Sequence, residues 1–146
     1  MKFTEYLRLN ESSRKVQPKT KKELIQIIKD TIEKEGYDCD LSFIDTSKIT
    51  DMAELFYVDV LNKFNGDISK WDVSGCQSMG GMFASSDFNG DISGWNISNA
   101  KVMTSMFANS KFTQDLSNWV IDKTCKTMFM FVGCKISKDH MPRFKK

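Results

Sequence analysis

Aspartate is the residue type whose spacing first suggests chemistry. Asp40, Asp67, Asp91 and Asp115 recur at intervals of 27, 24 and 24 residues, and we call such a set of equivalent positions a column. Carboxylates stacked about 4.8 Å apart repel each other unless something offsets their charge. Two explanations are open: each carboxylate accepts backbone N–H groups of its own turn, or the column binds cations. We favour the turns.

The other residues that could do chemistry lack the partners they would need. The stretch 87–91 resembles a calcium loop, but no glutamate stands at its twelfth position. His140 is the only histidine and lies far in sequence from any candidate nucleophile. The cysteines form no CxxC pair and are expected to be free thiols: Cys39, Cys76, Cys125 and Cys134. We therefore predict that the protein is not an enzyme and holds no cofactor and no metal.

Tryptophan forms a second column, with Trp71, Trp95 and Trp119 spaced by 24 residues. A row of exposed indoles would make a stacking platform for sugars or bases, whereas buried indoles would belong to a core. An ideal strand cannot bury Ile68 together with Trp71, but a bend near residues 69 and 70 would turn both inward. We favour buried or half-buried tryptophans, with the exposed alternative left open.

The columns belong to a sequence repeat. FNGDISKWDVS, FNGDISGWNIS and FTQDLSNWVID align without a gap, beginning at residues 64, 88 and 112, and a degenerate first copy spans 40–56. The Asn-Gly pairs predict turns with positive φ, the alternating residues after them a strand, and M-x-x-M-F one helical turn. The predicted fold class is α/β: a short leucine-rich-repeat-like solenoid with a turn, a short strand and a short helix in each coil. The phenylalanines at 83, 107 and 131 should be buried.

Four segments are predicted along the chain. Residues 1–19 form a flexible arm, 20–36 an N-terminal capping helix, 37–135 a four-coil solenoid, and 136–146 a basic closing segment. The helix prediction rests on the capping-box spacing of Thr20 and Glu23 and on the apolar residues that follow at helical spacing.

The pattern F-N-G-D-I-S-x-W-x-V/I-S followed by M-x-x-M-F resembles the BspA-type leucine-rich repeat family of bacterial surface proteins and some phage genomes, over residues 40 to about 135. This resemblance implies an adhesion or protein-binding solenoid without an active site. The opening F-x-E-Y-L-x-x-N-E also resembles the leaders of tailed-phage head proteins, in which Leu9-Asn10-Glu11 would match a processing site.

Charge and hydropathy limit the partners and the location that we expect for the protein. The chain has 146 residues, with 21 basic and 19 acidic side chains. At net +2 it lacks a strong field for nucleic acid, so a nucleic-acid partner is not expected. No segment has the apolar core of a signal peptide or the length of a membrane span. We expect a cytoplasmic or virion location.

A protein-binding surface is predicted on the polar face of the repeat. Lys70, Asp72, Asn96 and Asn118 differ between copies while the framework around them is constant. We predict a non-catalytic protein-interaction repeat module with these four residues in contact with a protein partner, whose identity stays open. The alternative is a structural or virion-associated bacteriophage component, with the N-terminal arm as a docking or cleaved leader.

Overall fold

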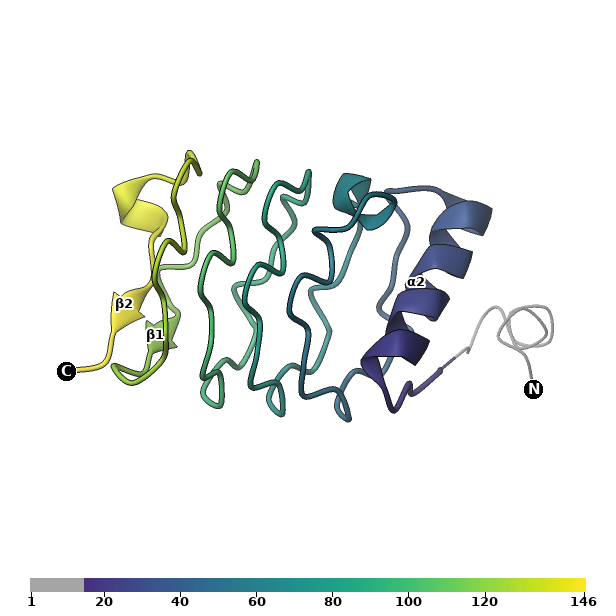
Figure 1. Cartoon of the computed structure of the whole chain (residues 1–146), viewed down its shortest axis with the longest axis horizontal. Coiled ribbons are helices and arrows are strands. Elements are labelled where there is room, and N and C mark those ends of the chain that lie inside the picture. Colours follow the sequence, from purple (N-terminus) through teal and green to yellow (C-terminus); the bar gives the residue numbers. More distant parts are fainter. Residues whose placement is uncertain (1–14) are drawn as a thin grey trace.

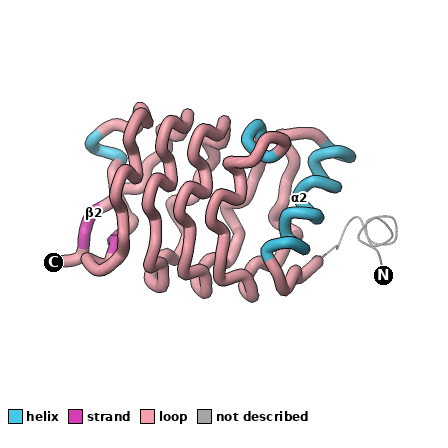
Figure 2. Tube along the Cα trace, in the orientation of Figure 1, coloured by secondary structure: helices cyan, strands magenta, loops and turns pink. Residues whose placement is uncertain are grey.

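The computed structural model describes residues 15 to 146 as a row of loops, with one α-helix beside the first of them (Figure 1). The regular elements are α2 (Lys21–Glu35), η1 (Leu61–Lys63), β1 (Val120–Ile121), η2 (Lys138–His140) and β2 (Arg143–Phe144). β1 and β2 pair in parallel, with Val120 opposite Arg143. The rest of the described chain consists of turns, bends and isolated bridges (Figure 2).

The predicted fold class, an α/β leucine-rich-repeat-like solenoid, is wrong. Within residues 15–146 the single α-helix precedes the first copy of the repeat, and each of the two strands has only two residues. No described copy contains the strand and short helix that every coil of such a solenoid was expected to have. α2 is therefore not the capping helix of that fold, but a helix whose buried side chains join one common core.

Hydrogen bonds between copies explain why the Met-x-x-Met-Phe segments are not helical. Every other residue from 79 to 85 donates its N–H to a carbonyl of the third copy, at N···O distances of 2.8 to 2.9 Å. Between them, Met82 and Ala84 donate to a carbonyl three positions back. Because half of the donors are used between copies, the i→i−4 bonds of an α-helix cannot form.

Backbone turns replace the predicted strands as well. The Trp71 N–H donates to the carbonyl of Ile68 at 3.1 Å, which closes a turn at residues 69 and 70. Ile68, Trp71 and Val73 are all at most 3% exposed. The predicted bend is thus confirmed. Because all three side chains point inward, the alternation of inward and outward side chains that a strand requires is lost.

Stacked aromatic rings form the centre of the core. The ring centroids of Phe56 and Phe83, and of Phe83 and Phe107, lie 5.5 Å apart, and those of Phe107 and Phe131 lie 5.4 Å apart. Phe83 and Phe107 are fully buried, as predicted, whereas Phe131 is only partly buried. A second row, Phe64, Phe88 and Phe112, runs beside the first.

The Asn-Gly pairs do not turn the chain in the way predicted. Neither Gly66 nor Gly90 has a positive φ, and neither do the asparagines before them. Gly66 is required for another reason: a Cβ there would lie 1.9 Å from the carbonyl oxygen of Cys39. The glycine permits two backbone segments to approach each other, which a single sequence does not reveal.

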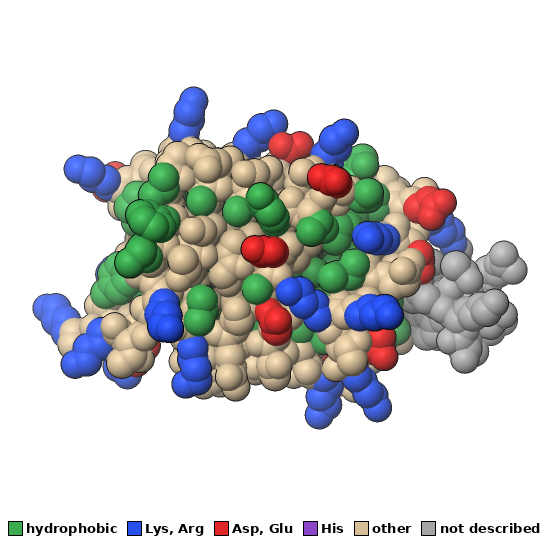
Figure 3. Space-filling view, in the orientation of Figure 1, with side chains coloured by type: hydrophobic (Ala, Val, Ile, Leu, Met, Phe, Trp, Pro, Cys, Tyr) green, Lys and Arg blue, Asp and Glu red, His purple; other side chains and the backbone are tan. Residues whose placement is uncertain are grey.

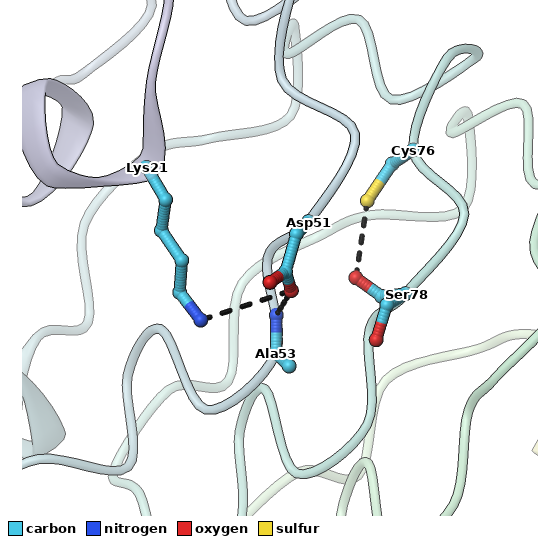
Figure 4. A network of polar contacts seen from close by, with 5 residues as sticks. All are labelled: Lys21, Asp51, Ala53, Cys76 and Ser78. Carbon is cyan, nitrogen blue, oxygen red and sulfur yellow. Dashed lines mark hydrogen bonds and ion pairs between the residues drawn. The ribbon is translucent and has the colours of Figure 1, made fainter.

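The helix predicted over 20–36 is present as α2. The side chain of Thr20 accepts the N–H of Glu23 at 3.1 Å, and Gly36, with φ 93°, follows the last helical residue. Figure 4 shows how the helix begins beside the first copy: Lys21 Nζ lies 3.7 Å from a carboxylate oxygen of Asp51, which also accepts the N–H of Ala53 at 2.8 Å. The buried residues of α2 are Leu24, Ile27, Ile28, Thr31 and Ile32.

A flexible arm was expected at residues 1–19, but its last five residues are bonded to the rest of the protein. Val16 donates its N–H to Phe43 at 3.1 Å and accepts the N–H of Asp45 at 2.7 Å, and Pro18 is buried. Residues 15–19 are therefore docked beside the first copy. The remainder of the expected arm, including the processing site at Leu9–Glu11, lies outside the described residues.

The basic closing segment lies along the fourth copy. Arg143 and Lys145 donate their N–H groups to the carbonyls of Trp119 and Ile121, at 2.9 and 2.8 Å, and this pairing forms β1 and β2. Leu116 donates in turn to the carbonyl of His140 at 2.8 Å. Residues 138–146 thereby cover one stretch of the fourth copy, residues 113–121.

Candidate functional site

The aspartate column is an array of turns. Each carboxylate accepts the N–H of the serine two residues on, at 2.8 Å in Asp40 and Asp115 and at 2.9 Å in Asp67 and Asp91. The described residues contain no group of three or more His, Cys, Asp or Glu side chains that could hold a metal ion. The turn explanation is confirmed, because the N–H bonds offset the charge that a bound cation was invoked to neutralise.

Serines two residues after these aspartates donate their hydroxyls within their own turns. Ser69 and Ser93 donate their hydroxyls at 2.7 Å to Asp67 and Asp91 of their own turns. These bonds, and after them the serine N–H bonds, hold the pKa values of both carboxyls below their usual range. Asp72 and Asp115 have lowered pKa values for the same reason.

Acid should therefore destabilise the protein. A carboxyl with a lower pKa in the folded than in the unfolded chain stabilises the fold above its unfolded pKa of about 3.9, and this contribution is lost as pH falls through the folded pKa. We expect the variant D67N/D91N/D115N to keep the turns, because the Asn96 amide oxygen accepts the Ser98 N–H at 3.1 Å in the same way. Its melting temperature should fall less between pH 5 and pH 3 than that of the wild type. Equal losses of melting temperature in the two proteins would contradict a stabilising role for these ionised aspartates.

The tryptophan column is buried, so the stacking platform is excluded for these three indoles. Trp71, Trp95 and Trp119 are 2 to 4% exposed. Each indole N–H donates to a backbone carbonyl of the preceding copy, at 3.0 Å to Leu41 and Ile68 and at 3.1 Å to Ile92. The indoles thus connect successive copies and are unavailable to a ligand.

Replacing Trp95 by Phe should destabilise the protein by about 1 to 3 kcal/mol, because a buried hydrogen bond between copies is lost. Trp71→Phe and Trp119→Phe remove an equivalent bond and should cost a similar amount. Urea unfolding followed by circular dichroism measures all three. A loss below about 0.5 kcal/mol, as at an ordinary surface position, would contradict this role.

A surface hollow lies above two of these tryptophans and contains two of the predicted partner-binding residues. It has a volume of about 320 Å³ and is lined by residues 93–98 and 118–120. Asn96 and Asn118 are both exposed at its surface, and Val120 is 46% exposed. The Asn118 amide donates to the carbonyl of Ser93 at 3.0 Å, which fixes the side chain across the gap between the third and fourth copies.

The other two predicted residues lie outside this hollow. Lys70 and Asp72 are exposed on the second copy. Asp72 accepts the N–H of Ser74 at 3.0 Å, so its carboxylate is engaged in a turn. The structure therefore brings Asn96 and Asn118 together, and places Lys70 and Asp72 on the same run of turns one copy earlier.

A ladder of asparagine side chains, which was not predicted, links successive copies. The Asn65 side chain accepts the N–H of Asn89 at 2.8 Å, and the Asn89 side chain accepts the N–H of Thr113 at 2.9 Å. These residues occupy one column, and their polar character at all three positions was the available signal. The ladder links three copies on the exterior and offers no nucleophile or ligand set.

The histidine and the cysteines show no reactive arrangement in the described chain. His140 Nδ1 lies 2.9 Å from the carbonyl of Thr113, so this nitrogen carries the proton. All four cysteines are free thiols, as expected. Cys76 donates to the carbonyl of Ser78 at 3.3 Å (Figure 4), and burial raises its pKa to about 11, which disfavours the nucleophilic thiolate.

No helix within residues 15–146 is long and apolar enough to cross a membrane. A protein-family model described as "Mycoplasma protein of unknown function, DUF285" matches residues 25–144. No curated protein and no solved structure matches the chain.

Proposed function

The chain belongs to the DUF285 family, and from that premise we propose that it is a non-catalytic protein-interaction module. The observation that carries this proposal is the hollow with Asn96 and Asn118 at its surface. Its rim offers amide groups beside the exposed Val120, a mixture suited to a peptide or protein surface. Its floor is held by buried tryptophans and so is rigid before a partner arrives.

Kinship with BspA-type surface proteins is the finer part of the proposal. It rests on the sequence pattern F-N-G-D-I-S-x-W and on no feature of a leucine-rich-repeat fold. A protein ligand is the class of partner that this kinship implies. The four residues Lys70, Asp72, Asn96 and Asn118 form the contact surface that we assign to it.

Charge changes that preserve the turns test this surface. In the variant K70E/D72N/N96D, the side chains at 72 and 96 keep an oxygen that can accept the serine N–H, while the charge pattern changes from plus, minus, neutral to minus, neutral, minus. A control variant, D59K/K63E, changes exposed charges in the segment between the first and second copies. All three proteins should have similar melting temperatures.

Quantitative pull-downs from the native source then compare the three proteins. A partner captured by the wild type and by D59K/K63E, but lost from K70E/D72N/N96D, is the expected result. Equal recovery of the partner by all three proteins would contradict the assignment of these residues to the contact surface. The virion alternative depends on Met1–Glu11, and the intact mass of the native protein tests whether that segment is removed.

A further inference from the structure

The fourth copy presents a row of backbone donors. Every other residue of the third copy from 103 to 109 donates its N–H to the fourth copy, at N···O distances of 2.7 to 2.9 Å. The equivalent residues 24 positions later are Thr127, Phe129, Phe131 and Gly133, and their N–H groups have no partner among the described residues. Four donors thus stand at the spacing of an acceptor segment that residues 15–146 do not supply.

Apolar side chains surround these donors. Phe129 is 60% exposed and Val132 is 54% exposed. Both line a hollow of about 410 Å³, together with residues 127, 130, 131, 141, 142 and 144. The ring of Phe131 stacks on Phe107 on one side and is only partly buried. Figure 3 shows hydrophobic side chains gathered at this end of the molecule. A segment added here would extend the phenylalanine stack as well as the hydrogen bonds.

A second copy of the chain does not suit this edge. The carbonyls of Thr127, Phe129 and Phe131 accept N–H groups from their own copy, so the edge offers donors and two such edges would oppose donor to donor. The opposite end of the row of copies, where acceptor carbonyls would be offered, is the first copy. There α2 lies beside the first copy, on the side away from the second (Figure 1). The described part of a second copy therefore offers no suitable acceptor edge, and we assign this one to an acceptor segment from another protein.

Charge narrows the chemistry of that segment. Residues 123–146 contain seven lysines and arginines and one acidic residue, Asp139. An acidic segment would be attracted to this surface and a basic one repelled. The neighbouring stretch 113–121 is already covered by residues 138–146, which limits the vacant edge to residues 127–133.

We propose that residues 127–133 form a docking edge for an extended, acidic segment of a partner protein. The carbonyls of alternate residues in that segment accept the four N–H groups, and one of its apolar side chains packs on Phe131. This edge is separate from the hollow of Asn96 and Asn118, and the proposal does not depend on the function assigned to that hollow.

A synthetic peptide provides the probe. Residues 101–110, KVMTSMFANS, contain four carbonyls that already accept N–H groups from the second copy. With two glutamates added at its N-terminus, this peptide should slow amide exchange of Phe129 and Phe131 in the intact protein about tenfold at saturation. A matched peptide with two lysines should bind more weakly, and the difference should shrink as salt rises. A peptide with Asp in place of its phenylalanine should lose most of its affinity.

Variants of the protein locate the binding. Val132→Asp adds a negative charge to the edge and should weaken the acidic peptide about tenfold, whereas Val58→Asp, at a residue 43% exposed on another part of the surface, should not. K70E/D72N/N96D should bind the peptide as the wild type does. A negative result for the surface of Lys70, Asp72, Asn96 and Asn118 can therefore be told apart from a negative result for this edge.

Three results would overturn the docking edge. One is exchange at Phe129 and Phe131 in the free protein as slow as at Phe107. Another is the absence of any peptide effect up to about 1 mM. The third is protection that appears with protein concentration alone, together with a dimer in sedimentation, since the edge would then pair two copies of this chain.

Discussion

Gly66→Ala should destabilise the protein by about 3 kcal/mol, at the upper end of the usual cost of overpacking. A Cβ at residue 66 would lie 1.9 Å from the Cys39 carbonyl oxygen and 2.7 Å from the ring of Phe64. The same carbonyl accepts the N–H of Asp67 at 3.2 Å. The backbone must move to admit the methyl group, and that movement breaks the bond between the second copy and the residue that precedes the first.

Gly94→Ala is the matched control for this substitution. No atom lies within 4 Å of a Cβ built at residue 94, and its φ is not positive. The change should be neutral or stabilise the protein by up to about 1 kcal/mol, because alanine restricts the unfolded chain. Thermal and urea unfolding of both variants make the comparison. If the two variants were equally stable, the Cys39 carbonyl would have to lie farther from Gly66 than it does in the structure.

Phe107→Ala should cost about 3 to 5 kcal/mol, as is typical of a fully buried phenylalanine. The ring of Phe107 is stacked between Phe83 and Phe131 and lies 4.5 Å from that of Phe112, centroid to centroid. Removing it opens a cavity with packed walls on every side. In a chain of this length the melting temperature should drop by roughly 2 to 4 °C for each kcal/mol lost.

Phe131→Ala should cost clearly less, because its ring is only partly buried among the described residues. The order of the two losses is the test, since both substitutions remove the same atoms. Equal losses would mean that the outer side of Phe131 is packed as well. In that case the docking edge at residues 127–133 would lose its vacant apolar face.

Positive φ angles recur in a column where none was predicted. Glu54, Gly81, Ser105 and Phe129 occupy one column and have φ between 57° and 62°, although only one of them is glycine. Such angles are uncommon outside glycine, and here the bonds between copies impose them. Residue type at these positions varies freely, so no sequence signal marks the column.

Sequence alone was sufficient to identify the residues that recur and much of what they do. Apolar and aromatic residues at a spacing of 24 were predicted to form the core, and the phenylalanines and tryptophans are buried there to the degree described. The Asx turns at the aspartates and the helix after Thr20 were also predictable, because both depend on bonds between residues two to four positions apart.

Only the tertiary structure decided how the backbone between those residues is bonded. A strand and a helix were predicted from local periodicity, but the N–H groups of residues 79 to 85 are divided between the next copy and their own turns. The requirement for Gly66, the placement of Asn96 and Asn118 at one hollow, and the donors at 127–133 that have no partner within residues 15–146 have the same origin. Each arises from contact between residues about 24 positions apart, and local propensity contains no information about such contacts.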